Sequence, residues 1–197
     1  MKIMRNIFIL CFFFFSSINN SWSKSASEFV SSLTNEVSVV LSSKLTDEEK
    51  IVNLKKIGES SVDIDGVGFY TLGKYRKTLT DSQKKKYKDL FRNYFLKSFS
   101  GRLVGYTDAK IAVLSEEIKN EKYTIVFTKL IGTSDRPEIK IDWRIYTKNP
   151  DNPLIRDLII EGLSLARTQK EEFSSILNSN DGDISALFKV LEEFSKN

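Results

Sequence analysis

The sequence contains no histidine in any of its 197 positions. That absence excludes serine–histidine and cysteine–histidine catalytic pairs, and it excludes the usual zinc ligand sets. The Gly-x-x-x-x-Gly-Lys run at 68–74 lies in a predicted helix and follows no predicted strand, and no Gly-x-Gly-x-x-Gly run follows one either, so a phosphate-binding loop is excluded as well. The common hydrolytic chemistries that depend on histidine are therefore ruled out.

Long apolar runs are also missing, because the longest extends only over the nine residues from Ile7 to Phe15. A helix that spans a bilayer needs about 20 such residues. Positive charge precedes the run and a polar stretch follows it at 16–20, which is the order of a cleavable secretory signal. Small residues at Ser21 and Ser23 place cleavage near Lys24. We therefore predict a signal peptide over 1–23, with a permanent membrane anchor as the alternative.

Cys11 is the only cysteine, and it lies inside this apolar run. A lipid-modified cysteine at a lipoprotein cleavage site is a further alternative. Leu10 argues against it, because such a site needs a small residue directly before the cysteine. Removal of the signal leaves no thiol, which excludes disulfides and a cysteine nucleophile from the mature protein.

Neither sign of charge is in large excess. The mature chain of about 174 residues (197 minus 23) loses Lys2 and Arg5, which leaves 28 basic side chains against 26 acidic ones. This near balance argues against a nucleic-acid partner. The length suits a single domain over 24–197 with an ordinary hydrophobic core.

Apolar residues spaced three and four apart predict helices before and after a central strand region. Capping boxes that begin at Thr46 and Thr80 mark two helix starts, and Asp183 is a candidate N-cap for the last helix. Gly66 and Gly68 weaken a short helix between the two boxes. The helices are expected at 26–41, 46–57, 62–73, from 80 to about 99, 165–177 and 184–194.

From Thr107 onward the apolar pattern changes to the alternation of half-buried strands. Strands are expected around 111–113 and over 123–130, 139–146 and 154–161, with links short enough for antiparallel hairpins. The fold class that follows is α+β, with a curved four-stranded antiparallel sheet packed against several helices. The pattern alone does not separate a packed aromatic core from a lined cavity.

The acids that could form a catalytic set are Asp63, Asp65, Asp157 and Glu161. Asp157 and Glu161 are four apart on a strand, which places their Cα atoms about 13 Å apart. Because that distance is too long for direct cooperation, we expect capping, turn and salt-bridge roles. The run Lys84–Lys86 is expected to be a solvated helix face.

Three sequence blocks resemble the MlaC-type periplasmic phospholipid-binding proteins, also called toluene-tolerance or ABC transporter auxiliary proteins. The first is 72–80 with Gln83 and Phe91, the second is the aromatic-rich 94–106, and the third is 157–165 with Phe173 and 182–183. The resemblance covers about 30–191. It departs from the family pattern near 153–154, where the family commonly has tryptophan, and at Lys170, where it usually has arginine.

The resemblance implies a periplasmic carrier that holds phospholipid acyl chains in a lipid-sized cavity between sheet and helices. It also implies exchange between an outer-membrane MlaA-type lipoprotein complex and an inner-membrane MlaD-type ABC transporter complex, in maintenance of outer-membrane lipid asymmetry. A monomer with no catalytic activity, cofactor or metal is expected. The implied cavity wall consists of Phe69, Phe91, Phe95, Phe99, Val113, Ile125, Phe127, Ile141, Trp143, Leu158, Ile160 and Phe173.

Tyr75, Arg76 and Lys170 are weaker candidates for the cavity mouth, and Arg76 could equally be a structural ion-pair partner. Three alternatives remain open. The cargo could be a hopanoid or another polycyclic lipid. The domain could be a cone-shaped α+β enzyme with an Asp/Tyr pocket, or a packed adaptor without a cavity.

Overall fold

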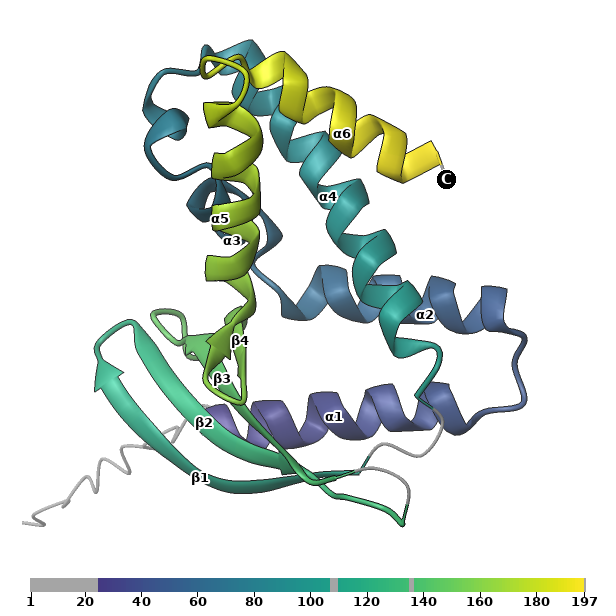
Figure 1. Ribbon diagram of the computed structural model, residues 1–197. Coiled ribbons are helices and arrows are strands. Elements are labelled where there is room, and N and C mark those ends of the chain that lie inside the picture. Colours follow the sequence, from purple (N-terminus) through teal and green to yellow (C-terminus); the bar gives the residue numbers. More distant parts are fainter. Residues whose placement is uncertain (1–24, 107–109, 135–136, 197) are drawn as a thin grey trace, which may run out of the picture.

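The computed structural model describes residues 25–106, 110–134 and 137–196 (Figure 1). The predicted signal peptide, Cys11 and the cleavage position near Lys24 lie outside the described residues. Within the described chain no helix is long and apolar enough to cross a membrane.

Among the described residues, four helices precede the sheet and two follow it. They are α1 (Ala26–Ser42), α2 (Asp47–Ser61), α3 (Ile64–Thr71), α4 (Asp81–Leu103), α5 (Leu165–Asn178) and α6 (Ile184–Lys196), with a 3₁₀ segment η1 (Gly73–Lys77) after α3. The boxes at Thr46 and Thr80 cap α2 and α4 as expected, with Glu49 and Gln83 as the reciprocal partners. A third box, Ser25 with Glu28, begins α1 and was not predicted.

The strands form one antiparallel sheet in the order β1-β2-β3-β4-β5. Their bounds are β1 (Ile111–Asn120), β2 (Tyr123–Leu130), β3 (Ile139–Tyr146), β4 (Leu154–Ile160) and β5 (Leu163–Ser164). The predicted α+β class is confirmed, but the sheet has a fifth short strand. β1 is also longer than expected, because pairing with β2 extends it through a polar stretch that is exposed from Leu114 onward.

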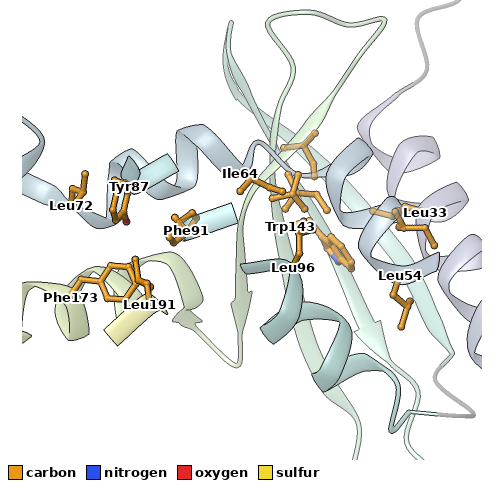
Figure 2. Packing of buried hydrophobic residues seen from close by; sticks show 14 of the residues in the cluster. Leu33, Leu54, Ile64, Leu72, Tyr87, Phe91, Leu96, Trp143, Phe173 and Leu191 are labelled. Atoms are coloured by element: carbon orange, nitrogen blue, oxygen red, sulfur yellow. The ribbon is translucent and has the colours of Figure 1, made fainter. Parts of the chain in front are cut away.

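The core has two regions joined into one apolar cluster. Figure 2 shows Leu72, Tyr87, Phe91, Phe173 and Leu191 among α3, α4, α5 and α6, and a second group with Leu33, Leu54, Leu96 and Trp143 where α1, α2 and α4 meet the sheet. The long helix α4 runs from one region to the other (Figure 1).

Candidate functional site

The two faces of the sheet differ in what covers them. Val126, Trp143 and Ile145 share one face and belong to the core cluster. Glu116 pairs with Val126 and so lies on the same face, and its carboxylate accepts from the backbone N–H of Ser27 at the start of α1 (2.6 Å). Because α1 lies against this face, we call it the helix-covered face. We call the other side the outer face. It carries Ile125 and Phe127.

An apolar row crosses the helix-covered face from β1 to β5. Cross-strand pairing joins Val113, Thr128, Ile141, Ile160 and Leu163 in that order. Val113, Ile141 and Ile160 are half-buried, whereas Leu163 is 60% exposed. The row is thus apolar except for Thr128, and its coverage decreases towards β5.

Thr128 fits this row because its hydroxyl is fully satisfied. The side chain is 1% exposed, and its Oγ1 accepts from Trp143 Nε1 (2.9 Å) and donates to the Ile141 carbonyl (2.8 Å). A buried hydroxyl that makes both bonds carries little desolvation penalty. The polar residue therefore leaves the apolar character of the row intact.

The second wall of the candidate site is a series of aromatic rings on α4. The rings of Phe91, Phe95 and Phe99 stack in order, with centroids 6.3 and 5.8 Å apart. Phe91 is 2% exposed and packs against Phe173 and the backbone of Gly68. Phe95 and Phe99 are half-buried. Coverage of the aromatic series thus decreases from the helical core region towards the sheet.

Several apolar side chains pack against the core cluster and yet stay partly exposed. From the predicted wall, these are Phe69, Phe95, Val113, Ile141 and Leu158. Phe91, Trp143 and Phe173 lie inside the cluster itself, with at most 7% exposure. These predicted wall residues therefore belong to one core cluster or pack against it. Their contact with a ligand stays a prediction.

The structure does not bring all twelve predicted wall residues to one face of the sheet, as one shared cavity would require. Ile125 and Phe127 point to the outer face, because Ile125 pairs with Arg144 and Phe127 with Asp142. They line a groove of about 700 Å³ with Val67 of α3. Side chains alternate in direction along a strand, so these two residues cannot reach the side on which Trp143 lies.

This outer-face groove has a charged lining. Lys119, Asp142, Arg144, Arg156 and Asp157 contribute to it, together with the apolar side chains named above. Its volume lies within the range of small-ligand sites, about 300–1,000 Å³. The charged side chains would have to stay solvated or paired if acyl chains were to occupy this groove.

The three predicted mouth residues lie along α5 or near its C-terminal end, away from the exposed end of the apolar row. Tyr75 donates its hydroxyl to Asn178 Oδ1 at the end of α5 (2.6 Å), and Arg76 is exposed on η1. Lys170 lies over the ring of Tyr70 (5.3 Å) and lines a polar groove of about 760 Å³ on α5. Since α5 rises about 1.5 Å per residue, Tyr75 is about 20 Å from the exposed end of the apolar row.

Asp157 has a structural role of the kind expected for it, but with partners that the sequence did not reveal. Its buried carboxylate accepts from Ser164 Oγ (2.6 Å) and from the backbone N–H of Ala166 (3.0 Å), with Arg144 at 3.7 Å. These bonds attach the first turn of α5 to β4. An Asp-x₆-Ser spacing across a hairpin has no distinctive local signal, so only the pairing of β4 with β5 shows it.

The other acids of the proposed set also have structural partners. Asp63 caps α3 at Gly66 and pairs with Arg156. Asp65 pairs with Lys88 (2.6 Å), and Glu161 accepts from the backbone N–H of Lys140. The four acids are thus used at separate positions around α3, β4 and the β4–β5 turn. Among the described residues no acidic cluster could hold a metal ion.

A buried polar group lies beside Phe69, in the helical core region. Tyr87 and Thr71 join their hydroxyls (2.8 Å), and both reach the carbonyl oxygen of Gly68. Burial raises the pKa of Tyr87 above its usual value. Burial also raises the pKa of Tyr94, with the Glu172 carboxylate as a second cause. Both tyrosines stay neutral at physiological pH.

Comparison with known proteins identifies the fold. A solved structure of a phospholipid-binding protein from Ralstonia solanacearum, in complex with a phospholipid, matches with a TM-score of 0.74 and 17% sequence identity. The match covers 88% of this chain and 98% of the other. No curated protein matches the sequence significantly. The family model described as "MlaC protein" matches residues 31–193, most of the chain, and the protein therefore belongs to the MlaC family.

Proposed function

We propose that the protein is a phospholipid carrier that holds acyl chains between α4 and the helix-covered face of the sheet. The observation that carries the proposal is the set of apolar side chains there that pack on the core and remain partly exposed, including Phe95, Ile141 and Leu158. Membership of the MlaC family and the similar fold of a protein solved with phospholipid support it. Both favour a binding and transport role over catalysis.

The energetics of acyl chains explain why such a protein needs partners. Burial of a methylene group contributes about 0.8 kcal/mol, so a phospholipid with ~30 methylenes gains more than ~20 kcal/mol before opposing terms. Release into water is negligible at that strength. We propose that transfer occurs on docking to an outer-membrane MlaA-type lipoprotein complex and an inner-membrane MlaD-type ABC transporter complex, with the protein in the periplasm.

The lipid-free protein is expected to close around the site. An empty apolar cavity costs about 24 cal/mol per Å³, so ~500 Å³ of void would cost about 12 kcal/mol, comparable to the whole stability of a domain. The near-complete burial of Phe91 and Trp143 is consistent with a closed arrangement. Acyl chains would then displace Phe95 and Phe99 from their present positions.

Organic extraction and mass spectrometry of freshly purified protein test the proposal. We expect about one phospholipid per chain, with two acyl chains. A polycyclic lipid in the extract would change the cargo, and an extract without lipid from a rigid, fully folded protein would contradict the carrier function.

A matched pair of variants locates the lipid. Leu158→Ser alters the helix-covered face, and Phe127→Ser alters the outer-face groove, with both residues half-buried on the sheet. We expect Leu158→Ser to reduce the lipid content of purified protein several-fold and Phe127→Ser to leave it close to wild type. The reverse result would place the acyl chains in the outer-face groove. Circular dichroism confirms that both variants are folded.

A further inference from the structure

The turn between β4 and β5 leaves two leucines exposed at the edge of the sheet. Leu163 is 60% exposed and Leu165 is 41% exposed. Glu161 and Gly162 form the turn with φ angles of 50° and 84°, so the chain reverses within two residues. The reversal sets Leu163 beside Ile160 on the helix-covered face.

The turn is fixed to its neighbours on both sides. Glu161 donates its backbone N–H to the Lys140 carbonyl (3.0 Å) and accepts from the Lys140 N–H through its side chain. Ser164 donates to the buried carboxylate of Asp157. These bonds hold Leu163 in place from both ends, so its exposure follows from the backbone geometry rather than from a loose loop.

The position of Leu163 is what distinguishes it from other exposed apolar residues. It is the last member of the row that runs through Val113, Ile141 and Ile160, and its exposure is the greatest in that row. Isolated exposed leucines are common on protein surfaces. Leu163, Ile160 and Ile141 follow one another across three strands, so they provide an apolar path from solvent into the row.

We propose that the β4–β5 turn is the port through which acyl chains enter and leave, and that Leu163 contacts the chain during passage. The inference rests on the proposed lipid-carrier function. An acyl chain that crosses the edge of the site is partly in water. Contact with Leu163 lowers the activation free energy of this passage and contributes nothing to the final bound state. Leu163 therefore acts on the rates of entry and exit, whereas Ile160, one strand further in, acts on affinity.

Stopped-flow kinetics with a single-chain lysophospholipid, fluorescently labelled on its head group, test the port directly. For Leu163→Ser we expect entry and exit to slow by the same factor, about threefold to tenfold, with an unchanged Kd. Ile160→Ser should instead raise the Kd. Val39→Ser on α1 is the control, since Val39 is 61% exposed but lies outside the row. It should change neither rates nor Kd.

The outcomes separate the port from the carrier function. If the wild type binds the probe and Leu163→Ser has unchanged rates, the port is wrong and the carrier function stands. If Leu163→Ser changes only the Kd, Leu163 belongs to the binding wall and the port is likewise wrong. If the wild type binds no probe, both proposals fail. Thermal unfolding shows whether each variant retains the wild-type fold, which the exposure of Leu163 and Val39 leads us to expect.

Discussion

At the scale of single residues, buried polar groups decide how the aromatic core is arranged. Tyr87 is fully buried among rings, and its hydroxyl is placed by Thr71 and the Gly68 carbonyl. The hydroxyl of Thr128 is likewise buried, and it accepts a hydrogen bond from Nε1 of Trp143. A buried hydroxyl without partners is costly, so each of these groups fixes the position of the side chain that carries it.

Replacement of Tyr87 by phenylalanine should lower the free energy of unfolding by about 1–2 kcal/mol, because Thr71 loses a buried partner. Urea denaturation measures the change. Tyr75→Phe, which removes an exposed hydrogen bond to Asn178, is the control and should cost less. Equal costs for the two variants would show that the buried hydroxyls contribute little.

The raised pKa of Tyr87 also predicts a loss of stability at alkaline pH. In the unfolded chain this phenol ionises near its ordinary pKa of 10.0, while burial keeps it protonated in the folded protein. The contribution of the protonated Tyr87 to the free energy of unfolding is therefore complete below pH 10. Above pH 10 the free energy of unfolding decreases by about 1.4 kcal/mol per pH unit for one such group. Urea titrations between pH 9 and about 11 should show a smaller decrease for Tyr87→Phe than for wild type.

At the scale of elements, β4 connects the sheet to the helices that flank the site. Its Arg156 pairs with Asp63 at the start of α3, and its Asp157 binds the first turn of α5. Adjacent side chains on a regular strand point to opposite faces. Here a bulge interrupts the register between Arg144 and Ile145, so Arg156 and Asp157 can both reach the flanking helices. The orientation of α3 and α5 against the sheet thus depends on one short segment.

Asp157→Asn should destabilise the protein by about 2 kcal/mol, since hydrogen bonds to a buried charged acceptor are stronger than neutral ones. Hydrogen exchange should show the loss of protection concentrated in the first turn of α5. Asp65→Asn is the matched control, because its ion pairs with Lys88 and Arg92 are at the surface and contribute little. A uniform loss of protection across the chain would contradict a local role for Asp157.

At the scale of the whole molecule, α4 spans two core regions with different degrees of coverage. The region around Tyr87 and Phe91 is closed by α3, α5 and α6, and the region near Phe95 and Phe99 is only partly covered. This distribution gives a stable helical end and a part beside the sheet that can admit a ligand. A ligand bound there should stabilise the folded state as a whole.

Lipid removal should therefore lower the Tm. A ligand at 100 times its Kd adds about 2.7 kcal/mol, which corresponds to about 5–10 °C for a chain of this size. Differential scanning calorimetry of the protein before lipid removal, after it, and after reloading with phospholipid measures the shift. Identical curves for all three samples would contradict ligand linkage.

The sequence by itself determined the order and type of the α-helices and of β1 to β4, since capping residues at Thr46 and Thr80 and apolar spacing are local signals. It also indicated Trp143 and Ile141 on one face of β3. Only the tertiary structure decided which face of β2 joins them. Thr128 reads as polar in the sequence, yet Trp143 satisfies its hydroxyl inside the core, and this places Ile125 and Phe127 on the outer face. Likewise, β5 and the exposed position of Leu163 exist only because β4 offers a partner and Asp157 holds the turn, and neither depends on a local pattern.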